Sequence, residues 1–227
     1  MRTASELVRA TKPFARESRW LSWWHFWSTL AALVGLLALA CLEMPWWGRL
    51  PVSILAGYAT IFLYGMCLYP LLLRPRQHAD AALALLLHTA LVTVLATFAP
   101  ALLLWTLLLP LWVATALGSY LFYAQHNFPG VRLLEGSAGD YAATALAGSS
   151  YIPMNAALRW FTGNIGYHHV HHLNARIPFY RLPEAMAGLE ELQSPGVTTL
   201  SPLGVYRCLR LKLWDPDLQR LVNFAGD

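Results

Sequence analysis

The chain has 227 residues, of which 57% are hydrophobic and only 12% carry a charged side chain. So large an apolar share is unusual for a soluble domain, and the composition therefore predicts an integral membrane protein. The net charge of +4 does not indicate nucleic-acid binding, because the basic residues are spread along segments that flank apolar runs. Anionic lipid headgroups are the expected partner. Three scattered cysteines exclude a disulfide framework.

Residues 1–27 are basic and mildly amphipathic, and they lack the compact apolar core and small-residue cleavage site of a secretory signal. We expect a cytoplasmic or interfacial segment that is kept in the mature protein. A transmembrane region is expected at 28–124, because a spanning helix needs about 20 mostly apolar residues. Pro100 should break its longest uncharged interval in two. The sequence thus predicts about four spans, near 28–46, 51–73, 81–99 and 101–124.

The basic residues predict the orientation of these spans. With four crossings, the N-terminus, the loop at 74–80 and the C-terminal region share one side, which holds every one of the 16 Lys and Arg residues except Arg49. The positive-inside rule makes that side cytoplasmic. Residues 125–227 have no further spanning run and are expected to form a cytoplasmic helical domain. Within it, Pro202 to Leu213 fits a membrane-surface helix and an ordinary packing helix about equally well.

The stretch GYHHVHHL at 166–173 places four of the chain's eight histidines in five consecutive positions. In a helix, His168, His171 and His172 stand at i, i+3 and i+4 on one face, while His169 points away. Converging neutral imidazoles suit a borderline divalent metal such as iron. His126 follows the fourth predicted span and should reach the same membrane face. The spacing therefore predicts a metal site in the cytoplasmic domain.

Two segments of the chain, YLFYAQHNFPG and LRWFTGNIGYHHVHHLNARIPFYRLPEA, resemble the C-terminal half of the membrane fatty acid desaturases, with HHVHH as the third histidine box. The resemblance implies an all-α membrane protein with cytoplasmic histidines, and iron bound by His126, His168, His171 and His172. In that family two irons activate dioxygen, and hydrogens are removed from a fatty acyl chain. Electrons come from a carrier such as a ferredoxin. A bacterial-type cytoplasmic membrane is the expected location.

The family's two other histidine boxes have no counterpart in this sequence. The remaining histidines are His25, His78 and His88, and no pair of them has the spacing of a box. We therefore expect little desaturase activity from this chain alone, because half a ligand set cannot position two irons. A related lipid hydroxylase and a non-catalytic metal-binding membrane protein are the alternatives. A homo-oligomer that pools ligands from two chains is a further possibility.

Overall fold

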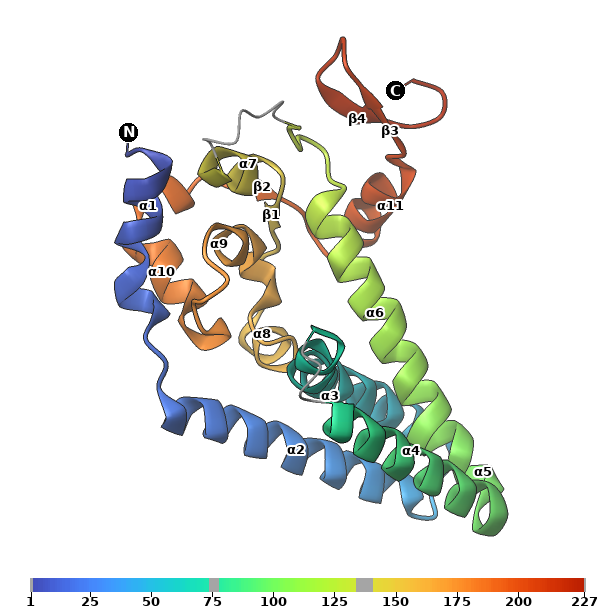
Figure 1. Cartoon of the computed structure of the whole chain (residues 1–227). Helices are drawn as coiled ribbons and strands as arrows, with labels where there is room; N and C mark the ends of the chain where they lie inside the picture. The colour runs from blue at the N-terminus through green and yellow to red at the C-terminus, as the bar shows by residue number, and fades with distance from the viewer. Residues whose placement is uncertain (1, 74–77, 134–140, 227) are drawn as a thin grey trace. The chain divides into compact units, whose positions relative to one another are not determined.

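The computed structural model describes residues 2–73, 78–133 and 141–226, without the side chains of 61–73, 78–85, 87 and 88. The described chain is mostly helical, and its elements follow one another as shown in Figure 1. The α-helices are α1 (Ala4–Ala10), α2 (Arg19–Cys41), α3 (Trp46–Leu73), α4 (His78–Phe98), α5 (Pro100–Leu103), α6 (Leu109–His126), α7 (Tyr141–Ala147), α8 (Ala156–Phe161), α9 (His168–Leu173), α10 (Leu182–Gly188) and α11 (Pro202–Arg210).

Shorter elements join these helices. The 3-10 turns are η1 (Lys12–Ala15), η4 (Ile165–Tyr167), η5 (Phe179–Arg181) and η6 (Glu190–Leu192), and a π-helical turn, η3 (Leu104–Leu108), joins α5 to α6. Four short strands are β1 (Ser150–Tyr151), β2 (Gly196–Val197), β3 (Leu213–Asp215) and β4 (Arg220–Val222). The first two pair in parallel and the last two form an antiparallel hairpin. The sequence analysis did not predict these strands.

Helix α2 lies earlier in the chain than the span predicted near 28–46. It begins at Arg19 and ends at Cys41. Its end has a local cause, since Pro45 cannot continue a helical hydrogen-bond ladder and disfavours helical geometry in the residue before it. At its start, Trp20 lies in the first turn of the helix, although residues 1–27 were expected to precede the span.

The predicted break at Pro100 is confirmed. Helix α4 ends at Phe98, and Pro100 is the first residue of α5, a position where its missing N–H costs nothing. From there the helical path runs to His126. Among the described residues, Arg19–Cys41 and Pro100–His126 are long and apolar enough to cross a membrane. The second and third predicted spans correspond to α3 and α4, whose side chains lie partly outside the described residues, and they stay predictions.

The chain divides into two compact units, Met1–Arg19 with Ser119–Asp227, and Trp20–Gly118. In the second unit, α3 approaches the beginning of α6 closely at Gly57. A Cβ atom on Gly57 would lie 2.7 Å from Cβ of Val113 and 2.8 Å from the carbonyl oxygen of Pro110. The absence of a side chain at Gly57 therefore allows the two backbones to pack together.

The first unit holds its elements around a core that includes α9. Helix α1 is capped by Thr3 and Glu6, each of which bonds the other's backbone N–H, and its Leu7 is buried in this core. Helices α7 and α10 both pack on α9. The buried members of the core are Leu7, Ala142, Tyr167, Val170, Leu173, Ile177, Leu182, Ala185, Leu189 and Leu192. This packing holds α9 in place through its buried Val170 and Leu173.

Candidate metal centre

The helix predicted around residue 168 is present as α9, and the turn before it is sharply bent. Gly163 and Asn164 both have left-handed backbone conformations, with φ of 57° and 54°. The amide of Asn164 donates to the carbonyl oxygen of Phe179 over 3.1 Å, which ties the turn to η5. Gly166 then passes so close to the Ile152 carbonyl oxygen that a Cβ there would overlap it. The residues GNIG thus set the direction in which α9 begins.

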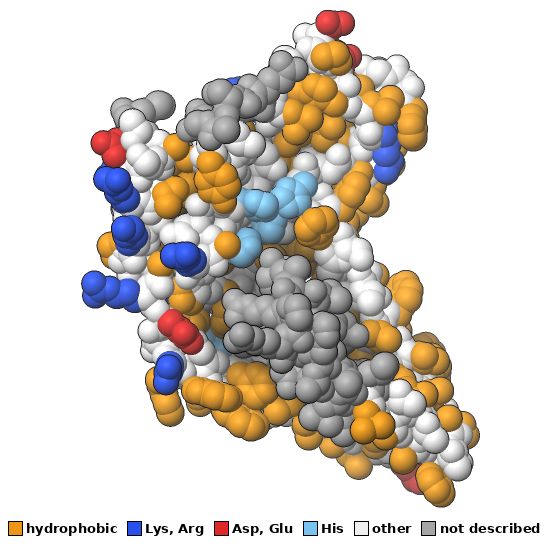
Figure 2. All heavy atoms as spheres, viewed as in Figure 1, with side chains coloured by type: hydrophobic (Ala, Val, Ile, Leu, Met, Phe, Trp, Pro, Cys, Tyr) orange, Lys and Arg blue, Asp and Glu red, His pale blue; other side chains and the backbone are white. Residues whose placement is uncertain are grey.

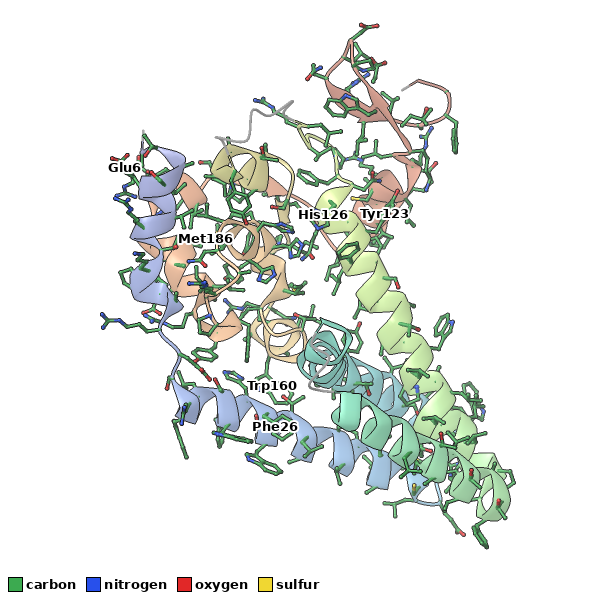
Figure 3. The ribbon with its side chains drawn as sticks, viewed as in Figure 1. Glu6, Phe26, Tyr123, His126, Trp160 and Met186 are labelled. Carbon is green, nitrogen blue, oxygen red and sulfur yellow. The ribbon has the colours of Figure 1, made fainter. Side chains whose placement is uncertain are left out.

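Three histidines converge on one point from α6 and α9. The Nε2 atom of His168 lies 3.0 Å from that of His126 and 3.0 Å from that of His172, and the remaining pair, His126 and His172, is 3.3 Å apart. Figure 3 shows His126 at the end of α6, next to α9. Figure 2 shows histidine side chains gathered on one face of the molecule. His168 and His172, at positions i and i+4 of α9, therefore lie beside His126 at the end of α6, as the sequence predicted.

These separations fit a shared metal ion. Two imidazole nitrogens bound about 2.1 Å from one ion at about 90–110° lie about 3.0–3.4 Å apart. The three separations between His126, His168 and His172 fall in this range. Three neutral nitrogens at such distances cannot all hydrogen bond to one another, because each Nε2 offers either one proton or one lone pair. A cation that accepts all three lone pairs satisfies the group.

The backbone selects the tautomer that a metal requires at His126. Nδ1 of His126 lies 3.3 Å from the carbonyl oxygen of Gly148. A carbonyl only accepts, so in this bond Nδ1 carries the proton and Nε2 presents its lone pair to the group. Nδ1 of His168 is buried and has no hydrogen-bond partner among the described residues.

Burial and proximity keep the α9 histidines neutral. The pKa of His168 is lowered to about 3, mainly because burial disfavours its charged form and also because His172 and His126 lie beside it. The pKa of His172 is lowered to about 4, mainly by burial and also by the neighbouring His126 and His171. Burial also lowers the pKa of His171. Neutral imidazoles are the form that binds metal, so protons compete weakly for this site near neutral pH.

The structure brings together three of the four predicted ligands. His126, His168 and His172 offer ligand atoms within 4.8 Å of one another, and His171 is not in that group among the described residues. The ring of His171 instead stacks on His168, with centroids 5.7 Å apart. Metal binding by any of the four residues stays a prediction. The side chains of His78 and His88 lie outside the described residues.

His169 occupies a separate place from the three converging histidines. It is fully buried, and its Nε2 lies 3.1 Å from the carbonyl oxygen of Leu192. Burial lowers its pKa to about 4, while the bond to Leu192 acts in the opposite direction. A carbonyl partner again places the proton on this nitrogen, so His169 ties α9 to η6. This agrees with its expected exclusion from the ligand set.

Sequence reasoning did not predict a role for Gln125, the neighbour of His126. Its side chain is fully buried, and its amide nitrogen donates to the carbonyl oxygen of Ile165 over 2.6 Å. Ile165 begins the turn that leads into α9. Gln125 therefore joins the helix of one ligand to the helix of the others. The signal in the sequence was a polar residue beside His126 at the end of an apolar run.

The described chain is mostly helical and combines two helices that are long and apolar enough to cross a membrane with three histidines that could hold a metal ion. The chain belongs to the fatty acid desaturase family. The family model described as "Fatty acid desaturase" matches residues 9–202, and so contains every histidine of the group. Family membership and the two apolar helices together indicate association with a membrane.

A curated relative agrees with the family assignment. The chain is 37% identical over 115 residues to a protein named "Fatty acid desaturase" from Bacillus subtilis (strain 168). The matched segment covers 50% of this chain and 32% of the relative, so the chain spans about a third of the length of that protein. No solved structure matches the chain.

Proposed function

We propose that this chain is an iron-binding membrane protein of the desaturase family that acts on fatty acyl chains, with His126, His168, His171 and His172 as its iron ligands. The observation that carries the proposal is the triangle of Nε2 atoms with edges of 3.0, 3.0 and 3.3 Å. The ring of His171 stacks on the ring of His168, and His171 is the candidate fourth ligand. A bacterial cytoplasmic membrane, with both termini on the cytoplasmic side, is the proposed location.

Iron at this site would supply the redox chemistry and dioxygen activation that no amino-acid side chain provides for an unactivated C–H bond. The chain's own residues prepare the site. The carbonyl of Gly148 sets the tautomer of His126, and the buried environment of His168 keeps its imidazole neutral and limits access of water. Gln125 and His169 hold the two ligand helices in place. An external electron carrier, such as a ferredoxin, completes the proposed system.

The sequence contains one histidine box and one separate histidine where the family pattern has three boxes. The proposal therefore assigns one iron to each chain and weak desaturation, or none, to the chain by itself. Two chains that pool their ligands in an oligomer would restore a second iron. The number of irons per chain distinguishes these cases.

Elemental analysis of iron and zinc on the detergent-purified full chain tests metal binding. We expect about one iron per chain, and a loss of most of it in His126→Ala, His168→Ala and His172→Ala. His25→Gln is the control, because it removes a histidine of α2 and leaves the converging group intact. Iron retained in all three cluster variants would overturn the site. Zinc in place of iron would identify a non-catalytic metal-binding protein.

Desaturation is tested separately on membranes that contain the full chain, acyl lipids, dioxygen and a reduced ferredoxin. Gas chromatography of the released fatty acids would report double bonds, and hydroxylated acids would report the alternative outcome. We expect turnover to be absent or weak, and to depend on His168 wherever it is detected. Efficient turnover that survives His168→Ala would contradict the proposed role of this site.

A further inference from the structure

Among the described residues, helix α11 packs against the protein on one side. Ser201 caps its first turn by accepting from the backbone N–H of Gly204, and proline fills the position after the cap. Cys208 is only 1% exposed and packs in a small core with Ala124 and Phe128 from the end of α6 and the residues after it. The side of α11 that bears Cys208 is therefore fixed against the protein.

The other side of α11 presents large apolar side chains to its surroundings. Leu203 is 57% exposed, Tyr206 is 56% exposed and Leu209 is 46% exposed. At 100° per residue, these three positions fall within one half of the helix circumference, away from Cys208. Leu213, just beyond the helix, is 48% exposed. Such a contiguous apolar face marks a surface that is covered by a partner or a membrane.

The same face carries basic residues and no acidic ones. Arg207 and Arg210 lie in the last turn of α11, Lys212 follows it, and the stretch 202–214 contains neither Asp nor Glu. The guanidinium of Arg210 lies over the ring of Tyr206, 5.6 Å from its centroid. Figure 2 shows hydrophobic and basic side chains side by side in the region of α11. An apolar face that also carries cations complements an anionic lipid surface.

Tyr123 in the last turn of α6 and Asn127, the residue after the helix, place α11 at the end of a candidate span. The hydroxyl of Tyr123 donates to the carbonyl oxygen of Leu211 over 2.8 Å. The side-chain amide of Asn127 donates to the same oxygen over 2.9 Å and to that of Cys208 over 3.1 Å. The candidate span ends at His126, between these two anchors. If the span crosses a bilayer, its end lies at the headgroup level, and α11 is held at that level.

We propose that α11 is an in-plane helix that binds the anionic phospholipid surface of the membrane that α6 enters. Leu203, Tyr206 and Leu209 insert below the headgroups, while Arg207 and Arg210 contact lipid phosphates. The inference rests on the proposed membrane location, but it goes beyond it by assigning a lipid-binding surface outside the metal centre. An acidic partner protein or a second copy of the chain is the competing occupant of this face.

Site-specific fluorescent labels on the full chain test the depth of α11. Leu203→Cys and Glu190→Cys are labelled in a background with serine at positions 41 and 67, and Trp112→Cys in α6 is labelled as a reference. Each protein is reconstituted as single chains in nanodiscs of phosphatidylcholine, with or without phosphatidylglycerol. A lipid with a quencher near its headgroup then reports proximity to the interface, and one with a quencher deep in its tail reports the span.

The expected result is strong headgroup quenching at position 203, deep quenching at position 112 and none at exposed position 190. Phosphatidylglycerol should increase the quenching at 203. This increase should be lost in R207Q/R210Q/K212Q and kept in R9Q/K12Q/R16Q, a control that removes three cations elsewhere in the same unit. The energy of about 1 kcal/mol per basic residue near an anionic surface corresponds to about fivefold in binding for each substitution.

The reference label separates two kinds of failure. If position 112 is quenched and position 203 is not, α11 does not lie on the lipid surface, and the membrane location of the chain stands. If neither position is quenched, both proposals fall. Shielding of position 203 from aqueous quenchers only when two chains share a nanodisc would assign the face to a second copy and overturn the lipid assignment.

Discussion

At the scale of single residues, the converging histidines are held in position by side chains outside their own group. His126 and its neighbour Gln125 have different roles. His126 contributes a nitrogen to the group, whereas Gln125 contributes a 2.6 Å hydrogen bond to Ile165 that holds α6 to the turn before α9. Partners of this kind orient ligands, and their loss weakens metal binding without removing a ligand.

Gln125→Leu is expected to lower iron affinity by about 10–100-fold, the usual effect of removing a residue that orients ligands. The variant keeps all the histidines but loses the bond to Ile165. Competition with an iron chelator measures the affinity. Gln193→Leu is the matched control, because it removes an exposed amide bond to the Ala187 carbonyl in the same unit. Equal affinities in the two variants would show that Gln125 does not position the site.

The neutral histidines of α9 predict a pH dependence of the metal-free protein. The folded pKa of His168 is about 3 and that of His172 is about 4, both below the usual 6.5. At a pH between the folded pKa values and 6.5, the unfolded chain binds protons that the folded chain does not. The contribution of these histidines to stability is therefore complete above about pH 6.5 and is lost as the pH falls. Thermal unfolding from about pH 7 to about pH 5 should show a falling Tm. The decline should be shallower in H168Q/H172Q, and an unchanged slope would contradict this cause.

At the scale of secondary-structure elements, small residues decide which helices approach closely. On α3, Ser53, Ala56 and Ala59 are fully buried, and Gly57 meets Pro110 and Val113 of α6. In the described part of α3, every buried position holds a small residue. The close approach fixes the beginning of the same helical run whose end carries His126.

Gly57→Ala should destabilise the protein, since the added Cβ has no space between α3 and α6. Overpacking of this kind costs about 1–3 kcal/mol and should lower Tm in detergent. Gly35→Ala is the matched control, because a Cβ at Gly35 in α2 meets nothing within 4 Å. That change should be neutral or raise stability by about 0.5–1 kcal/mol. Similar Tm losses in both variants would argue against the close approach.

The elements also show what local sequence signals can predict. The helix at α9 and the break at Pro100 follow from residues that are adjacent in the chain, and both were predicted. The start of α2 was not, because residues 1–27 were assigned as one segment before the first span, whereas the helix begins at Arg19. The bond between Gln125 and Ile165 joins residues 40 positions apart, and no local pattern encodes such a pairing.

At the scale of the whole molecule, the sequence predicted the family and the grouping of three histidines but not the packing of the N-terminus. Met1–Arg19 joins the C-terminal unit, with Leu7 buried in the core beside α9. One buried leucine in a basic segment is a weak signal, and only the tertiary fold selects its partner. The predicted convergence of His126 with the α9 histidines came from the order of the spans and the spacing of the box.

The orientation of the chain in a membrane stays a prediction and can be measured with thiol reagents that do not cross membranes. In a background with serine at 41 and 67, Glu43→Cys, between α2 and α3, should react from outside intact cells. Arg9→Cys in α1 should react only after the cells are opened, because the basic segments are expected inside. The buried Cys208 should stay unlabelled in both variants. Labelling of position 9 in intact cells would reverse the orientation.

The last turn of α6 and the residue that follows it join three parts of the first unit within five residues. Tyr123 and Asn127 hold α11, Gln125 holds the turn before α9, and His126 belongs to the histidine group. A substitution at one of these positions changes how the other three side chains reach their partners. The four positions should therefore vary together during evolution. Homologues that lose His126 are therefore expected to vary at Tyr123, Gln125 and Asn127 as well, whereas homologues that keep it should retain all four.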